Sequence, residues 1–240
     1  MNAIVIIPTY NERDNIPPLV ESLLHHDGVR VLIVDDASPD GTGAAADEAA
    51  RLHPGRVDVL HRASGRGFGR SYIDGIRRAV AMGSDLICQM DADFSHDPAA
   101  LPSLLAAADR ADIVIGSRYV RGGGVVNWPL HRRLLSRFAN LYVRAITRLE
   151  ARDCTSGYRC WRREALAAMP IDCFVSDGYS FLVEMLFVAA RQGRRIAEVP
   201  ITYVERREGQ SKMTRAVIVE SAITPWRLVA RPTSAQPPIR

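Results

Sequence analysis

The first half of the chain alternates short apolar runs with longer amphipathic stretches, and this alternation is what most restricts its fold. The apolar runs have the length of buried strands, whereas the stretches between them repeat apolar residues with helical spacing. We expect strands at 3–7, 29–34, 57–60, 85–90 and 113–115, and helices at 15–25, 42–52, 69–82 and 98–108. The pattern predicts an α/β fold with a mostly parallel sheet and helices on both faces.

The second half is less regular, but no linker separates it from the first. We expect a Gly-rich turn at 122–124 and three helices at 131–150, 181–192 and 216–229. We also expect a strand at 195–204 and a polar loop at 205–212. A length of 240 residues with 47% hydrophobic and 24% charged residues is ordinary for one globular domain. We therefore expect a single domain over 1–230, followed by a flexible tail at 231–240.

The cysteines and the N-terminus bear on the compartment. Cys88, Cys154, Cys160 and Cys173 form no CxxC pair and have no His at zinc-ligand spacing, so neither a zinc site nor a disulfide framework is indicated. No signal peptide precedes the first strand, and no apolar run reaches the length needed to span a bilayer. We expect a cytoplasmic protein that is not transmembrane, although it could lie against a membrane.

Two carboxylates follow the apolar run at 86–90. Asp91 and Asp93 would therefore lie at the carboxyl edge of the sheet, where open α/β folds bind ligands. Mg²⁺ or Mn²⁺ is typically held by one or two carboxylates together with substrate phosphates, because a small hydrated ion prefers oxygen ligands. An Asp-rich turn without a ligand is the alternative for this motif taken alone.

Other candidates follow the first two strands. Tyr10 and Glu12 come after the first strand, where a ring and a carboxylate can contact a base or ribose, although an ordinary capped loop is an equal alternative. Asp36 follows the second strand, at the edge position for a nucleoside. The glycines at 65–69 lack the rest of a phosphate-loop motif, so we interpret them as a turn before a helix.

Arginines crowd the stretch at 132–163, a patch that suits phosphates, anionic lipid or nucleic acid. Within it, the helix at 131–150 combines apolar residues at helical spacing with interspersed arginines. Such a helix can rest in a bilayer interface, but packing of its apolar side on the domain core is at least as common. The helix at 216–229 has Pro225 and Trp226, which suit a kink and an interfacial anchor.

Seven motifs occur in one order along the chain. They are PTYNE, VDDASPDGT, MDADFSHDP, GSRYV, CTSGYR, GYSF and EVPITYVERREGQSKM. In this order they resemble the polyprenol (dolichol) phosphate mannose synthases of glycosyltransferase family 2, over residues 3–213. The resemblance implies a GT-A fold and a metal-dependent, inverting transfer of mannose from GDP-mannose to a polyprenyl phosphate at the cytosolic membrane face. It also implies a nucleotide-sugar half at 1–120 and an acceptor and membrane-facing half at 121–230.

The resemblance also implies roles for individual residues. Asp91, Asp93 and Arg118 would be catalytic, with Asp93 binding the cation and Asp91 contributing to the metal site while lying along the nucleotide. The guanosine would be held by Pro8, Tyr10, Glu12, Val34 and Asp36, and the rest of the nucleotide sugar by Asp91, Ala92, Arg118, Arg206 and Lys212. Where some members have a Gln metal ligand this chain has Ser95, so Ser95 or water would complete the metal site. Arg132 and Ser136 become candidates for the acceptor phosphate.

The chemistry of the implied reaction agrees with these residue types. A phosphate monoester is already ionised near neutral pH, because its second pKa is about 6. It can therefore attack the anomeric carbon without a strong general base, and the reaction chiefly needs a cation and guanidinium groups to stabilise the departing diphosphate.

Three alternatives remain open. The nearest is the same fold using UDP-glucose or another nucleotide sugar. The second, a non-catalytic nucleotide- or lipid-binding module, is less favoured because Asp91, Asp93 and Arg118 are intact. The third, a nucleic-acid binder that uses the arginine patch, is less favoured because the chain has no recognised nucleic-acid motif. The sequence also leaves open whether a separate membrane subunit is needed.

Overall fold

The computed structural model describes residues 2–63, 67–176, 178–205 and 215–230. The strands are β1 (Ala3–Thr9), β2 (Val29–Asp35), β3 (Val57–His61), β4 (Leu86–Gln89), β5 (Ile113–Ser117), β6 (Gly124–Val126), β7 (Arg159–Arg162), β8 (Ile196–Pro200) and β9 (Thr202–Val204). The helices are α1 (Ile16–Leu24), α2 (Thr42–Leu52), α3 (Phe68–Ala81), α4 (Leu101–Ala107), α5 (Leu130–Thr147), α6 (Arg163–Ala167), α7 (Gly178–Arg191) and α8 (Arg215–Ala230). Short 3₁₀ turns occupy Pro98–Ala100 and Ile171–Cys173.

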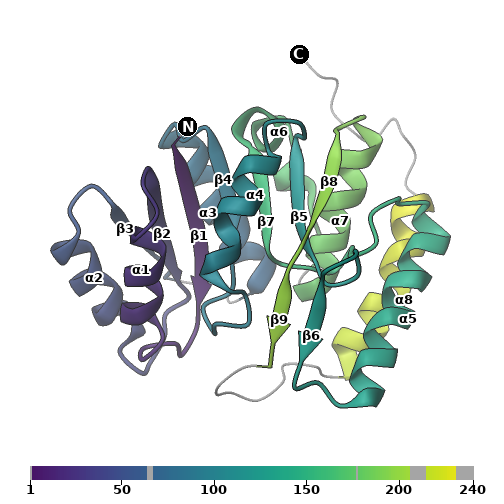
Figure 1. The fold of residues 1–240 in the computed structure, drawn as a ribbon, viewed down its shortest axis with the longest axis horizontal. Helices are drawn as coiled ribbons and strands as arrows, with labels where there is room; N and C mark the ends of the chain where they lie inside the picture. Colours follow the sequence, from purple (N-terminus) through teal and green to yellow (C-terminus); the bar gives the residue numbers. More distant parts are fainter. Residues whose placement is uncertain (1, 64–66, 177, 206–214, 231–240) are drawn as a thin grey trace.

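A seven-stranded sheet with the order β3-β2-β1-β4-β7-β5-β8 forms the centre of the fold, and β6 pairs with β9 in a small second sheet (Figure 1). The pairs β1–β2, β1–β4, β2–β3 and β5–β8 are parallel, whereas β7 runs antiparallel to both β4 and β5. The mostly parallel sheet and the five expected strands of the first half are confirmed. The sheet draws strands from both halves of the chain.

Helices cover both faces of the sheet, as predicted, and each face has its own apolar core. Alternate residues of β1 point to opposite faces: Ile4 and Ile6 join the core under α3, α6 and α7, whereas Val5 and Ile7 join the core under α1, α2 and α4. These four side chains are fully buried. Burial on both faces explains why the strand is a continuous apolar run.

The second half departs from the sequence-based expectations at two strands. β7 was not predicted, because Arg159 and Arg162 interrupt its apolar character, yet Arg159 is fully buried. The expected strand at 195–204 is divided into β8, in the large sheet, and β9, in the small one. The division falls after Pro200, at Ile201, whose N–H donates to the carbonyl of Ser117 while its own carbonyl accepts from Gly124.

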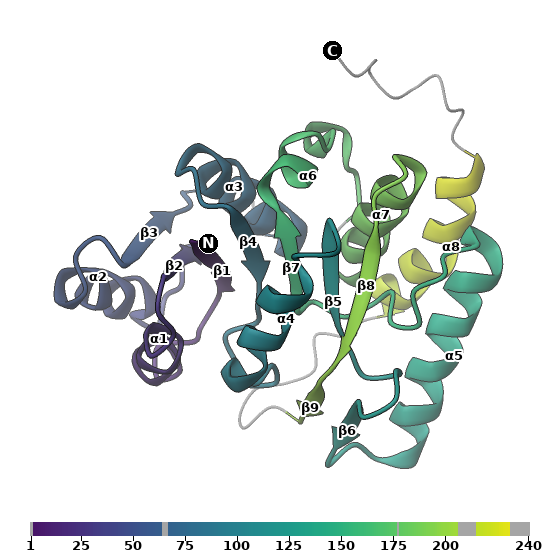
Figure 2. The same ribbon diagram turned by 45° about the horizontal axis from the view of Figure 1, so that its top comes forward.

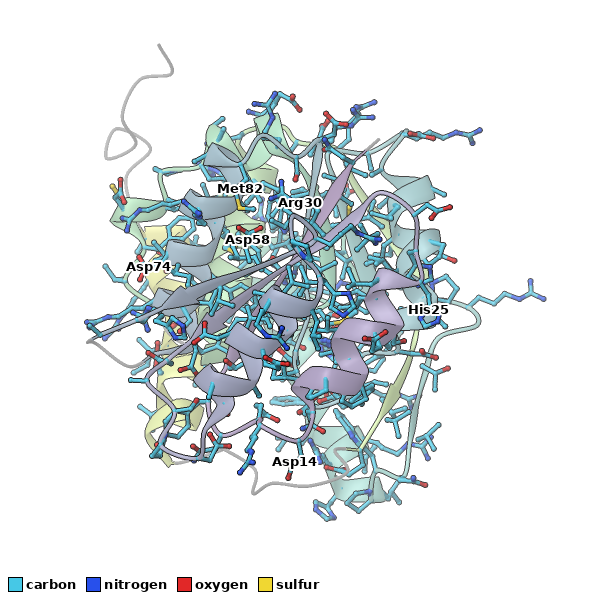
Figure 3. The ribbon with its side chains drawn as sticks, turned by 90° about the vertical axis from the view of Figure 1, so that its left-hand side faces the viewer. Asp14, His25, Arg30, Asp58, Asp74 and Met82 are labelled. Carbon is cyan, nitrogen blue, oxygen red and sulfur yellow. The ribbon has the colours of Figure 1, made fainter. Side chains whose placement is uncertain are left out.

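Figure 3 views the sheet from the side of α1 and α2 and helps to locate its two edges. Asp14, labelled near the bottom, precedes α1 and lies near the carboxyl edge, whereas Met82 follows α3 at the opposite edge. Arg30 of β2 and Asp58 of β3, also labelled, form an ion pair of 2.9 Å across the two strands. The carboxyl edge is where Asp36, Asp91 and Arg118 leave β2, β4 and β5.

α5 and α8 lie side by side at the end of the molecule farthest from α2 (Figures 1 and 2). The Tyr142 hydroxyl of α5 donates to the Ala222 carbonyl of α8 at 2.7 Å and accepts from the Trp226 indole at 2.9 Å. α5 ends at Thr147, three residues before the expected end, where Arg148 takes a left-handed conformation. Among the described residues, no helix is both long and apolar enough to cross a membrane.

A glycine on α3 is required by the close approach of that helix to the sheet. A Cβ atom at Gly75 would lie 2.7 Å from Ile6 Cγ2 and 3.1 Å from Val34 Cγ2, both on buried strands. We expect Gly75→Ala to lower the free energy of unfolding by about 1–2 kcal/mol, because overpacking outweighs the better helix propensity of Ala. Gly124→Ala is the control, since a Cβ atom there meets nothing within 4 Å. Equal urea midpoints for the two variants would contradict this account.

Candidate active site

Asp91, Asp93 and Ser95 follow β4 at the carboxyl edge of the sheet, as predicted. The Asp93 side chain is held in place because Ser95 N–H donates to its Oδ1 at 3.0 Å. Ser95 is fully buried, and its Oγ has no hydrogen-bond partner among the described residues. A buried hydroxyl without a partner is costly unless something else binds it. The structure thus places two carboxylates and an uncommitted oxygen together, although no group of three Asp, Glu, His or Cys side chains forms a metal cluster in the described part of the chain.

His96 holds this loop in place through a hydrogen bond and ring contacts. Its Nδ1 accepts from the Asp91 N–H at 3.1 Å, which places the proton of the neutral ring on Nε2. The ring stacks on Tyr158 at 5.1 Å and meets the edge of Tyr203 at 5.6 Å. Burial lowers the pKa of His96 below its ordinary value, against the opposing charges of Asp91 and Asp93. His96 therefore acts as a neutral acceptor that fixes the backbone at Asp91, a role that sequence reasoning missed.

The nucleoside candidates lie at the ends of β1 and β2. Asp36 is buried, with Oδ1 hydrogen-bonded to Arg62 and Oδ2 accepting from the Gly67 N–H at 3.0 Å. Arg62, which the sequence analysis did not single out, is held in turn by Asp74 at 2.8 Å. Val34 is buried in β2 and pairs with Pro8 of β1. Tyr10 and Glu12 lie in the β1–α1 connection, where the Glu12 N–H donates to Thr42 Oγ1 at 2.9 Å.

Arg118 leaves the end of β5 and is buried against a partner that sequence reasoning missed. Its Nε and Nη2 donate to the two carboxylate oxygens of Asp153 at 2.7 and 2.6 Å, and its backbone N–H donates to the same carboxylate at 3.0 Å. Burial alone would lower the pKa of Arg118, but the negative charge of Asp153 and the hydrogen bonds to it together outweigh this and hold the pKa above its ordinary value. Both side chains therefore stay charged across the working pH range.

Three aromatic rings surround the Arg118 guanidinium. The rings of Tyr119, Trp128 and Tyr203 have their centroids 5.3, 5.7 and 5.5 Å from its central carbon. Tyr203 also contacts His96, so one ring joins the loop after β4 to the loop after β5. Arg118 therefore lies in the same cluster of side chains as His96, which holds the backbone at Asp91.

The acceptor candidates lie on α5 beside this cluster. Arg132 stacks on Trp128 with 4.2 Å between the guanidinium carbon and the ring centroid, and it forms an ion pair with Glu205. Ser136 Oγ accepts from the Tyr119 hydroxyl at 2.6 Å. Arg132 and Ser136 are therefore both connected to the surroundings of Arg118. The remaining phosphate candidates, Arg206 and Lys212, and the polar loop predicted around them lie outside the described residues.

The electrostatic arrangement of this edge has two parts. Asp91 and Asp93 supply negative charge after β4, while Arg118 after β5 and Arg132 on α5 supply positive charge. Each arginine already has a carboxylate partner, so Asp91 and Asp93 leave these described groups with a net negative charge rather than a basic one. Such a site suits a ligand that brings its own anionic groups and a cation together.

Comparison with known proteins agrees with this arrangement. The family model described as glycosyl transferase family 2 matches residues 4–169. The chain is 48% identical over 236 residues to the undecaprenyl-phosphate mannosyltransferase of Micrococcus luteus, covering 96% of each chain. It is 44% identical over 242 residues to the polyprenol monophosphomannose synthase of Mycolicibacterium smegmatis, covering 99% of this chain and 91% of that protein.

Among solved structures, glucosyl-3-phosphoglycerate synthase of Mycobacterium tuberculosis has a similar fold. Its complex with Mn²⁺, UDP and phosphoglyceric acid gives a TM-score of 0.72 at 18% identity, covering 97% of this chain and 80% of that one. Its complex with Mg²⁺ and UDP gives 0.68 at 19% identity, covering 93% and 79%. The fold is that of a GT-A glycosyltransferase. The chain belongs to glycosyl transferase family 2.

The buried state of His96 predicts a pH dependence of stability. Because its pKa in the folded protein is lowered, the unfolded chain binds a proton more readily as the pH falls through about 6.5, and stability is lost in that direction. We expect the melting temperature to fall between pH 7.5 and 5.5, and to fall less in His96→Asn, whose amide oxygen can still accept from Asp91. His131→Asn, at an exposed histidine, should keep the full pH dependence. A slope unchanged in His96→Asn would contradict this role.

Proposed function

We propose that the protein transfers mannose from GDP-mannose to a polyprenyl phosphate with inversion, giving polyprenyl phosphate mannose and GDP. The observation that carries the proposal is the likeness, over nearly the full length, to two relatives named as mannosyltransferases or synthases with this type of lipid acceptor. The buried edge of the sheet supports it, because it supplies carboxylates and a guanidinium group, which suit a glycosyl transfer in which a diphosphate leaves.

The residues after β4 fit a divalent cation, which we propose to be Mg²⁺ or Mn²⁺. The fit rests on Asp91, Asp93 and the buried Ser95 hydroxyl that has no partner within the described structure. These are oxygen donors, the type that both ions prefer, and their small number suits an ion that completes its ligands with water and substrate phosphates. When bound, the cation neutralises the diphosphate as it leaves. A structural neighbour in the same fold class was solved with each of these ions and UDP.

The reaction itself needs little proton transfer. A phosphate oxygen of the acceptor forms a bond to the anomeric carbon while the bond from that carbon to the GDP oxygen breaks, and GDP departs with the bonding electrons. Because the phosphate is already ionised near neutral pH, no general base is required. Arg118 is proposed to bind the donor diphosphate, and Arg132 and Ser136 the acceptor phosphate. Arg132 would exchange Glu205 for that phosphate.

The donor base is proposed to be held at the ends of β1 and β2. Asp36 has both oxygens oriented by Arg62 and Gly67, and a carboxylate can accept further N–H groups of the kind that guanine presents. Tyr10, Glu12, Pro8 and Val34 border the same edge. UDP-glucose or another nucleotide sugar is the competing donor. Incubation with each donor, the cation and a short polyprenyl phosphate, followed by mass analysis of the lipid, decides between them: a hexose gain with GDP-mannose alone supports the proposal.

We propose that the protein binds the membrane surface peripherally, through α5 and α8. Large apolar residues on these two helices are 41–70% exposed, namely Leu130, Leu134, Leu135, Phe138, Leu141, Val219, Ile223, Trp226 and Val229. Phe138 stacks on Tyr142, which bonds Trp226, so the apolar surface is continuous from one helix to the other. An exposed apolar surface of this kind marks an interaction site, and a water-insoluble polyprenyl acceptor requires the enzyme to reach the bilayer.

The proposed side of the membrane is the cytosolic face. The four cysteines are all free, and three of them are buried, which agrees with a reducing compartment.

Asp93→Asn tests the metal assignment. The amide keeps the shape of the side chain but removes the charge that holds the cation, so we expect transfer to fall at least a hundredfold, about 2.7 kcal/mol in the barrier, while the melting temperature changes little. Asp97→Asn, at an Asp that caps the following 3₁₀ turn, is the control for loss of a nearby carboxylate. Full activity of Asp93→Asn at ordinary cation concentrations would overturn the assignment.

Leu134→Ser tests the membrane surface against a matched residue. Leu134 on α5 and Leu52 on α2 are both 57% exposed, but they lie at opposite ends of the molecule. We expect Leu134→Ser combined with Phe138→Ser to weaken sedimentation with anionic vesicles at least tenfold, because each buried apolar side chain contributes about 1.5–3 kcal/mol. Leu52→Ser should bind as wild type does.

Arginines on the same helix test the electrostatic part. Replacing Arg133, Arg137 and Arg144 together with Gln should also weaken vesicle binding, since each contributes about 1 kcal/mol near an anionic surface. Added salt should reduce the difference between this variant and wild type. Binding that is equal for all of these variants would place the membrane contact elsewhere.

A further inference from the structure

α5 has a buried polar residue on the side that faces the domain. Asn140 is 3% exposed, whereas Phe138 and Leu141 beside it are more than 60% exposed. Its Nδ2 donates to the Ser136 carbonyl at 3.0 Å and to Thr155 Oγ1 at 3.1 Å, and its Oδ1 accepts from the Cys154 N–H at 2.8 Å. Because a backbone N–H can only donate, this last bond fixes the orientation of the amide.

Thr155 connects Asn140 to Arg118. Its hydroxyl accepts from Arg118 Nη2 at 2.8 Å and from Asn140 Nδ2, and it lies 3.4 Å from Asp153 Oδ1, to which it donates. A hydroxyl has one donor and two acceptor positions, so all three are used. No rotation of this hydroxyl improves one of these bonds without breaking another.

The hydrogen bonds among Asn140, Thr155, Asp153 and Arg118 decide which N–H groups of Arg118 can bind a ligand. A guanidinium has five N–H groups, and those on Nε and Nη2 are directed to Asp153 and Thr155. Aromatic rings of Tyr119, Trp128 and Tyr203 surround the group. Within the described structure, no hydrogen bond is formed by Nη1, so this corner of the guanidinium is the one left to bind phosphate oxygens.

We propose that Asn140 and Thr155 are positioning residues through which α5 directs Nη1 of Arg118 toward the donor diphosphate. The inference rests on the proposed function for the role of Arg118. A second contact, from the Tyr119 hydroxyl to Ser136 Oγ, ties the next residue of the same loop to α5. The helix that carries the apolar surface thus also sets the direction of the arginine.

The chain offers isosteric variants that separate positioning from folding. Thr155→Val removes the hydroxyl and keeps the shape, and Thr155→Ser keeps the hydroxyl. Asn140→Asp replaces the donor by an acceptor next to Asp153 and so should act like Thr155→Val. Thr147→Val is a matched control on α5, because the Thr147 hydroxyl donates only to the Val143 carbonyl of its own helix.

We expect Thr155→Val to lower kcat about tenfold to a hundredfold, because a small misplacement of a group that acts on the transition state is costly. Binding of GDP with Mn²⁺, measured by calorimetry, should weaken several-fold. Thr155→Ser should restore most of both losses. Thr147→Val should alter neither. Its melting temperature should fall less than that of Thr155→Val, because it loses one hydrogen bond whereas Thr155→Val loses three.

A double-variant cycle with Arg118→Lys decides whether the effect passes through Arg118. If it does, Thr155→Val lowers kcat and GDP affinity in the wild type but causes no further loss in the Arg118→Lys background. Equal losses in both backgrounds, or a Thr155→Val variant with the kcat and GDP affinity of wild type, would overturn the inference. Absence of hexose transfer by the wild type would instead refute the proposed function, and the calorimetric cycle would still test the positioning.

Discussion

The arrangement of the site depends on the buried ion pair between Arg118 and Asp153, because burial removes both charges from bulk water. Asp153 is fully buried, and its pKa is lowered because the charge of Arg118 and the hydrogen bonds that Arg118 donates together outweigh the effect of burial. Removing one partner of such a pair leaves an uncompensated charge, which typically costs about 3–5 kcal/mol. The pair therefore holds the end of β5 to the loop before β7. Glu198 of β8 fixes the same loop by accepting from the backbone N–H of Asp153 at 3.0 Å.

The antiparallel strand β7 explains why that loop reaches the site at all. Parallel strands place the residues that follow them at the carboxyl edge, but an antiparallel neighbour places there the residues that precede it. Because Arg159 pairs with Gln89, the residues just before β7 lie beside those just after β4. A Cβ atom on Gly157 would lie 3.6 Å from Asp91 Oδ1 and 3.4 Å from His96, so these two loops are in contact. One reversed strand thus joins the second half of the chain to the metal-binding candidates.

The predictable part of the structure is the part encoded by local pattern. β1 to β5 and the placement of Asp36, Asp91 and Asp93 follow from apolar runs and the polar residues after them. The partners were not predictable, since Arg62 lies 26 residues from Asp36, and Asp153 lies 35 residues from Arg118, with no local signal linking them. β7 was missed for a related reason: Arg159 is buried only because three backbone carbonyls accept its N–H groups, while burial lowers its pKa to about 10.

α5 shows how an amphipathic pattern can leave its orientation undecided. From sequence, the apolar side of this helix could equally face the core or a bilayer. In the structure, the side that faces the domain carries Asn140, Val143 and Thr147, and the larger Leu134 and Phe138 face outward. The hydrogen bonds of Asn140 decide this, because an amide that satisfies a backbone N–H and a buried hydroxyl has no equivalent partners outside. The burial of one polar side chain therefore leaves the apolar residues of the helix exposed. The same contact that fixes the loop of Arg118 thus leaves the apolar surface that we propose to contact lipid.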